Sequence, residues 1–152
     1  MSGPRREDNR MPKPFPHETP QPDTFVGRLG IRVTGRGEGF ARCELEVVPW
    51  FLNIRNGVVH GGVIFSLVDT GTAAAVHTVM DPGEVCSTIE LTVTYLRAVR
   101  SGQLVCESRV LRRGNRVVFL EAEVFNDGEL VAKGLGTYYV TREKGRGAAE
   151  VP

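Results

Sequence analysis

The stretch NIRNGVVHGG-VIFSLVDTGTAAAVHTVM, residues 53–80, decides the fold. It begins as a polar loop punctuated by glycines and continues as the most apolar segment of the chain. Residues 62–80 contain no proline and carry apolar side chains at helical spacing on nearly every face, which predicts a buried helix. A membrane span is the competing interpretation. Asp69 argues against it, because a carboxylate at a bilayer centre costs about 2.5–3.5 kcal/mol.

Asp69 is the one carboxylate in this helix, and a buried charge without a partner is costly. It is either a structural acid, paired with an arginine or backbone amides, or a reactive acid in a partly desolvated pocket. Gly61 and Gly62 favour the reactive acid, because N–H groups at a helix start lack partners within the helix and the dipole adds about half a positive charge. No Lys-Ser/Thr pair follows these glycines, as a phosphate loop would require. The helix start is therefore predicted to hold a developing oxyanion.

The composition describes one domain of ordinary size. The 152 residues carry a formal net charge of +1, which gives no indication of a nucleic-acid partner. Three cysteines without a CxxC pair, and the absence of a secretory segment, predict a cytoplasmic protein with reduced thiols and no metal site. Residues 1–22 hold six of the nine prolines and are expected to be a disordered arm, followed by a domain at 23–142 and a flexible tail at 143–152.

Short strands joined by tight turns are predicted on both sides of the helix. A short helix capped at Asp23 or Thr24 is expected first. Alternating apolar and polar residues then indicate half-buried strands, and glycine-containing turns indicate hairpins. The expected strands are 31–35, 40–48, 89–95, 104–111, 118–124 and 130–140. One long central helix and an antiparallel sheet of five to six strands make an α+β architecture in which the sheet wraps around the helix.

The pattern Gly57-x-x-His60-Gly61-Gly62, with Asp69 nine positions after the histidine, resembles the signature of the hotdog-fold acyl-CoA thioesterases. The closest branch is the phenylacetate-pathway, or PaaI-type, group, and residues 88–97 and 128–133 are similar to strands of that family. The resemblance implies a hotdog fold and hydrolysis of an acyl-CoA thioester without a metal or other cofactor. It also implies a homodimer or homotetramer, in which the helix start of one subunit faces the acid of its neighbour.

The resemblance assigns roles residue by residue. It implies that the Gly61 N–H polarises the thioester carbonyl and that Asp69 either activates a water or attacks as a nucleophile. Thr88 matches a hydroxyl residue that helps to orient the attacking water. Because Thr88 is in phase with Glu90 on the polar side of its strand, it needs a strand-end irregularity or a neighbouring subunit to reach the site.

Other candidates follow from the same comparison. Another residue occupies the family's usual asparagine position, so the water-binding role passes to Asn53, which we favour, or to Asn56. His60 is either a base or a support for the loop. The residues predicted to contact substrate are Gly62, Phe65 and Asn56.

Thioester hydrolysis also agrees with the chemistry of these residues, because it develops charge on one oxygen and needs a base near water. No G-x-S-x-G motif is present to support a serine hydrolase. Two other functions stay open: a hotdog module that binds acyl-CoA without hydrolysing it, and a hotdog enoyl-CoA hydratase or dehydratase. The expected partners are an acyl-CoA substrate and further copies of the chain, with no nucleic acid and no membrane. Trp50, Phe51 and Phe65 are candidates to line a pocket for an aryl or medium aliphatic acyl group.

Overall fold

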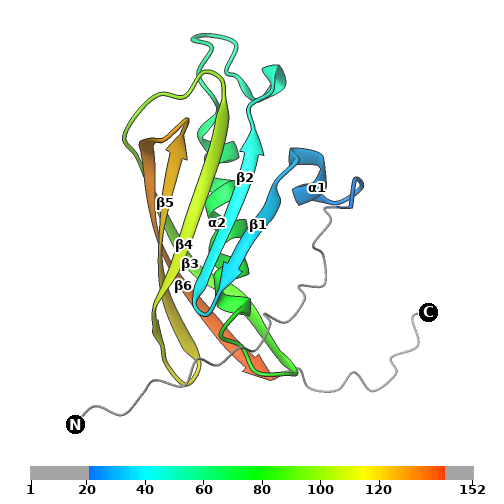
Figure 1. Ribbon diagram of the computed structural model, residues 1–152, viewed down its shortest axis with the longest axis vertical. Coiled ribbons are helices and arrows are strands. Elements are labelled where there is room, and N and C mark those ends of the chain that lie inside the picture. The colour runs from blue at the N-terminus through cyan, green and yellow to red at the C-terminus, as the bar shows by residue number, and fades with distance from the viewer. Residues whose placement is uncertain (1–20, 143–152) are drawn as a thin grey trace.

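A long helix, α2 (Gly61–His77), lies at the centre of the structure, and an antiparallel sheet curls around it (Figure 1). The computed structural model describes residues 21–142. The predicted tail, and all of the predicted arm but its last two residues, lie outside the described residues. The other elements are α1 (Phe25–Leu29), β1 (Arg32–Gly37), β2 (Phe40–Glu46), the 3-10 helix η1 (Pro49–Phe51), β3 (Glu84–Tyr95), β4 (Gln103–Arg113), β5 (Val117–Asn126) and β6 (Glu129–Arg142).

The strands of residues 21–142 form one six-stranded sheet in the order β1-β2-β4-β5-β6-β3, and every neighbouring pair is antiparallel. Helix α2 contacts all six strands, so the sheet covers the helix from one edge to the other. β1 and β3 are the edge strands. The predicted α+β architecture, a long helix wrapped by an antiparallel sheet, is confirmed.

Helix α2 begins one residue before the predicted start and ends three residues before the predicted end at Met80. The early end has a local cause: the Thr78 hydroxyl donates to the Ala75 carbonyl at 2.7 Å and accepts from the Gly39 N–H at 2.8 Å. The helix buries most of its surface, but Phe65 remains 40% exposed. No helix within residues 21–142 has the length and apolar character needed to cross a bilayer.

Two glycines let the helix approach the sheet closely. A Cβ on Gly71 would lie 2.9 Å from the Ser108 hydroxyl of β4, and a Cβ on Gly134 of β6 would lie 2.7 Å from a methyl of Val68. These contacts leave no room for a side chain at either position. They fix the depth at which α2 sits against the two strands, and with it the position of Asp69, which follows Val68 on the helix.

Strand β3 contains a bulge. Thr88 pairs with Tyr138 and Glu90 with Thr137, so that Ile89 has no partner on β6. An inserted residue reverses the side on which later side chains point. Ile89, which the alternation places on the same side as Leu91, is therefore 58% exposed, and that part of the pattern was wrong.

Candidate active site

His60 caps the start of α2. Its backbone is extended, with φ −60° and ψ 133°, and its Nδ1 accepts the Gly62 N–H at 2.9 Å. A Cβ on Gly62 would lie 2.9 Å from the same Nδ1, so the cap requires glycine there. The Gly61 N–H, in contrast, has no acceptor within residues 21–142. Of the two predicted glycine amides, one is used by the fold and the other has no acceptor in the described part of the chain.

Tyr95, at the end of β3, holds the same helix start from the other side. Its hydroxyl donates to the Gly61 carbonyl at 2.9 Å, and a Cβ on Gly61 would lie 3.2 Å from the ring carbon Cζ. Partial burial raises the pKa of the Tyr95 hydroxyl, which keeps it a donor near neutral pH. Sequence reasoning missed this residue as part of the site.

Asp69 lies half-buried in the middle of α2, where two hydroxyls hold one of its carboxylate oxygens. Thr88 donates to Oδ1 at 3.1 Å, and Tyr138 donates to the same oxygen at 3.0 Å. No lysine or arginine of the described chain forms an ion pair with Asp69. Oδ2 has no hydrogen-bond partner within residues 21–142. The carboxylate is thus oriented through one oxygen and open at the other.

The β3 bulge is what brings Thr88 to this acid, and Tyr138 is the residue opposite it on β6. Tyr138 is buried, and its hydroxyl also lies 2.8 Å from the Thr72 hydroxyl of α2. Burial is the largest cause of a raised pKa at Tyr138, so the Tyr138 hydroxyl stays a neutral donor. Sequence reasoning missed Tyr138, although it alternates in phase with the core residue Val140.

The two asparagine candidates both stabilise the loop before α2. The Asn53 Nδ2 donates to the Val58 carbonyl at 3.1 Å, and the Asn56 Oδ1 accepts the Val58 N–H at 3.1 Å. Asn53 lines a pocket together with His60, whereas the exposed Asn56 does not. Phe65, the third predicted substrate contact, lines neither of the two pockets found beside the helix start.

The structure therefore holds two separate groups of site residues. Gly61 and Asp69 are eight residues apart on one helix, about 12 Å at 1.5 Å per residue. A single carbonyl cannot contact both within one chain, since hydrogen bonds span about 3 Å. Each chain supplies an amide at the helix tip and, two turns away, an oriented acid.

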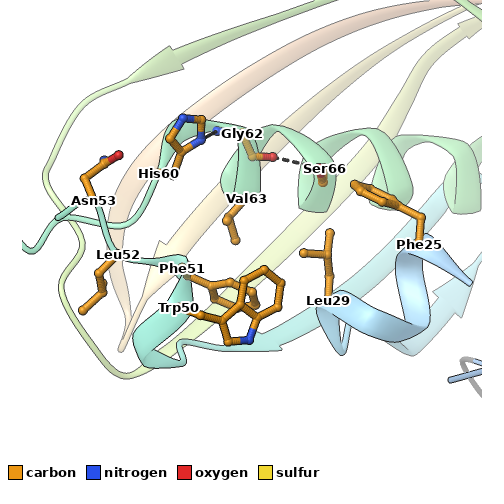
Figure 2. A pocket seen from close by; sticks show the side chains of 10 residues that line it. All are labelled: Phe25, Leu29, Trp50, Phe51, Leu52, Asn53, His60, Gly62, Val63 and Ser66. Carbon is orange, nitrogen blue, oxygen red and sulfur yellow. Dashed lines mark hydrogen bonds between the residues drawn. The ribbon is translucent and has the colours of Figure 1, made fainter. Parts of the chain in front are cut away.

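A pocket of about 480 Å³ opens beside the helix tip (Figure 2). Its walls come from α1, η1 and the first two turns of α2. Its polar side chains are Asn53, His60 and Ser66, and the apolar lining is Phe25, Leu29, Trp50, Phe51, Leu52 and Val63. A second, smaller cavity of about 320 Å³ lies on the other side of the tip, against Gly61 and Tyr95.

These groups suit one class of chemistry. Within residues 21–142 no three His, Cys, Asp or Glu side chains gather where they could hold a metal ion. A free amide at a helix tip stabilises an oxyanion, and a carboxylate with one open oxygen can take a proton from water. Together they can support acyl transfer to water.

Comparison with known proteins agrees with this chemistry. Residues 56–133 match the model of the thioesterase superfamily. A candidate esterase from Saccharolobus solfataricus is 35% identical over 80% of this chain and 86% of that protein. The medium/long-chain acyl-CoA thioesterase YigI from Escherichia coli is 29% identical over 76% of this chain and 84% of its own. The structure of the E. coli PaaI protein from the phenylacetic acid degradation operon has a TM-score of 0.69 at 28% identity, covering 75% of this chain and 81% of that one.

The match covers the helix tip, Asp69 and Thr88 together, and the fold is that of the matched structure. Thioester hydrolysis is the general activity that this relationship supports. The chain therefore belongs to the thioesterase superfamily, as a hotdog-fold protein of the PaaI type.

Proposed function

We propose that the protein hydrolyses an acyl-CoA thioester to a free acid and CoA, with no metal or other cofactor. The observation that carries the proposal is Asp69, an acid on a half-buried helix position that has two hydroxyl donors, no cationic partner in the described chain and one open oxygen. A structural acid would be expected to pair with an arginine or with backbone amides, and Asp69 has neither partner within residues 21–142. The name of the YigI relative supports CoA as the thiol, and we place the activity in the cytoplasm.

In the proposed reaction the thioester carbonyl oxygen accepts the Gly61 N–H. A water held between the open Oδ2 of Asp69 and the Thr88 hydroxyl attacks the carbonyl carbon, and Asp69 takes the proton that the water loses. Negative charge gathers on the carbonyl oxygen, where the amide and the helix dipole stabilise it. Collapse of this intermediate breaks the carbon–sulfur bond, and the CoA thiolate leaves and takes up the proton that Asp69 accepted, which restores the carboxylate.

Asp69 could instead attack the carbonyl directly, forming an anhydride that water then hydrolyses. The contacts favour the general base. Thr88 donates its one hydroxyl proton to Asp69 Oδ1, so its oxygen is left to accept from a water. Label on Asp69 after a single turnover in ¹⁸O-labelled water, measured by mass analysis of the protein, would establish the nucleophilic route, because it requires water to attack the Asp69 carbonyl of an anhydride and a general base exchanges no oxygen.

The two halves of the site are proposed to meet across a homodimer, with a tetramer as the larger assembly. The outer edge of β3 has no strand beside it within residues 21–142, and exposed apolar side chains, Ile89 and Phe65, lie on β3 and on the uncovered face of α2. Such surfaces are typical of interfaces between subunits. Pairing would bring the helix tip of one copy to the Asp69 of the other.

A panel of acyl-CoA esters with a thiol-trapping reagent tests the activity. Release of free thiol by the wild type and its loss in Asp69→Asn are expected. The asparagine can still accept from Thr88 and Tyr138, so the variant should keep the wild-type unfolding midpoint. Intact, bound acyl-CoA would instead identify a binding module, and a change in double-bond absorbance without thiol release would identify a hydratase.

Mixing two inactive variants tests the shared site. In a dimer of one Gly61→Pro and one Asp69→Asn chain, one of the two shared sites is intact, whereas sites within single chains would all be defective. Random reassociation makes half of the dimers mixed, so the mixture should recover about a quarter of wild-type activity. No recovery in dimers that have demonstrably exchanged subunits would contradict a site shared between copies.

A further inference from the structure

We infer that the pocket between α1, η1 and the start of α2 binds the acyl group of the substrate. Its lining selects an apolar acyl group, aliphatic or aromatic, and excludes one that carries a second carboxylate. The inference rests on the proposed function, which places the thioester carbonyl at the Gly61 amide.

Position is the first argument. His60 and Gly62, which flank the Gly61 amide in the sequence, both line the pocket (Figure 2). Val63 and Ser66 continue its wall along the first turns of α2. Gly61 itself lines the smaller cavity with Tyr95, so its amide lies at the helix tip between the two cavities. An acyl chain attached to a carbonyl there is inferred to enter the larger and more apolar of the two.

The lining is built by two short elements that have no evident role in the catalytic chemistry. Thr24 caps α1 by accepting the Gly27 N–H at 3.1 Å, and Gly30 closes the helix in the left-handed conformation. Phe25 and Leu29, four residues apart, then lie on one face of α1 and point toward the pocket (Figure 2).

Aromatic rings form the opposite wall. Phe51 is buried, and Trp50 stands over it edge-on, with ring centroids 4.4 Å apart. Trp50 and Phe25 are 66% and 68% exposed, which is high for such large apolar side chains. An apolar acyl group lying between them would remove this surface from water.

Charge is the argument for selectivity. No lysine, arginine, aspartate or glutamate lines the pocket. Its polar side chains are already used: Asn53 donates to the Val58 carbonyl, Ser66 donates to the Gly62 carbonyl and His60 accepts the Gly62 N–H. A second carboxylate would lose its water and find no cation, which is strongly unfavourable.

The volume of the pocket determines how the affinity for acyl-CoA should depend on the length of the acyl chain. A volume of about 480 Å³ falls within the usual range for small-molecule sites, about 300–1,000 Å³. Burying one methylene is worth about a fourfold gain in affinity. Affinity should therefore rise by about fourfold for each methylene added until the chain fills the pocket, and then level off.

Trp50 lines this pocket and is the single tryptophan of the chain, so a change in tryptophan emission reports on the surroundings of this one side chain. Full-length Asp69→Asn protein, which should bind without turnover, is titrated with CoA and with acetyl-, butyryl-, octanoyl-, phenylacetyl- and succinyl-CoA. Octanoyl- and phenylacetyl-CoA should shift the Trp50 emission toward shorter wavelength, and CoA, acetyl-CoA and succinyl-CoA should leave it unchanged. Octanoyl-CoA binding, measured by calorimetry, without a change in Trp50 emission would overturn the inference.

A variant that reverses the preference makes the test independent of any one signal. Leu29→Lys places a cation in the pocket, and its flexible stem can keep the charge solvated while the helix folds. It should weaken octanoyl-CoA binding and strengthen succinyl-CoA binding. The ratio of the octanoyl-CoA affinity to the succinyl-CoA affinity should fall by tenfold or more. Leu29→Met, with similar volume and no charge, should keep the wild-type ratio.

The outcomes separate this inference from the proposed function. A wild type that hydrolyses acyl-CoA, with an octanoyl-to-succinyl preference unchanged in Leu29→Lys, refutes the pocket and leaves the thioesterase activity intact. A wild type that hydrolyses none of the esters, but whose Trp50 responds to octanoyl-CoA and not to succinyl-CoA, supports the pocket and refutes the activity.

Discussion

Replacing Gly61 by proline removes one hydrogen-bond donor from the helix tip with little other change. Gly61 is the first residue of α2, where proline is well tolerated because the missing N–H has no partner within the helix. His60, the residue before it, has ψ 133°, in the extended region that a following proline requires. We therefore expect Gly61→Pro to fold and to lack only the proposed oxyanion donor.

Gly61→Ala is the matched control. Both substitutions add a Cβ that would lie 3.2 Å from the Tyr95 ring, so both require the same small movement of that ring. Only the alanine variant keeps the amide proton. The ratio of their turnover numbers reports the loss of the N–H together with the proline ring carbon that replaces its hydrogen, and loss of one oxyanion-hole donor is worth about 10²–10³ in kcat, or about 2.7–4 kcal/mol.

The assay is thiol release from octanoyl-CoA, with kcat and KM determined for both variants and the wild type. The proline variant should lose turnover relative to the alanine variant with a smaller change in KM, because the donor acts mainly in the transition state. Unfolding midpoints should agree between the two variants. A folded Gly61→Pro protein that turns over at the rate of Gly61→Ala would refute the oxyanion role of the helix tip.

Substitutions at three further positions test the surrounding structure. Tyr138→Phe removes a donor to the Asp69 carboxylate, a bond worth about 1.5–3 kcal/mol, so kcat should fall about 10- to 100-fold; an altered KM with unchanged kcat would count against a positioning role. His60→Ala should cost about 0.5–2 kcal/mol of stability through loss of the helix cap, and His60→Asn should restore it; if activity returns as well, His60 is a loop anchor and not a base. Hydrogen bonds from the Asp81 amide and, to a smaller extent, from Arg113 lower the pKa of Glu84. The ionised Glu84 therefore stabilises the fold at neutral pH, and this contribution is lost as the pH falls through the lowered pKa. The unfolding midpoint of Glu84→Gln should therefore lie below that of the wild type at pH 7 and meet it below about pH 4, and a constant difference would contradict the linkage.

Much of the fold follows from local patterns in the sequence. The apolar run before Met80 has helical spacing, and the strands on either side alternate with a period of two. Turns at Gly114 and at Gly128 are where short-range signals place them. Such patterns predict which elements form, because each element must bury one face whatever its neighbours are.

The contacts between elements were harder to predict. Tyr95 and Tyr138 both contact site residues, but neither has a signal that distinguishes it from an ordinary strand tyrosine. Their roles depend on strand register, which places Tyr138 opposite Thr88 on β6. Register is a property of two strands together and is not encoded in the periodicity of either one.

Thr88 shows how a single irregularity can determine a site. With regular alternation, the side chain that shares the inner face with Leu91 would be Ile89, and Asp69 would face a branched aliphatic group in place of a hydroxyl. The bulge inserts one unpaired residue, turns Ile89 outward and brings the Thr88 hydroxyl to 3.1 Å from the carboxylate. The same insertion leaves an apolar side chain on the free edge of the sheet, where a second copy is proposed to lie. One extra residue in β3 would thus orient the acid of its own subunit and supply apolar surface for the contact that brings in the helix tip of the next.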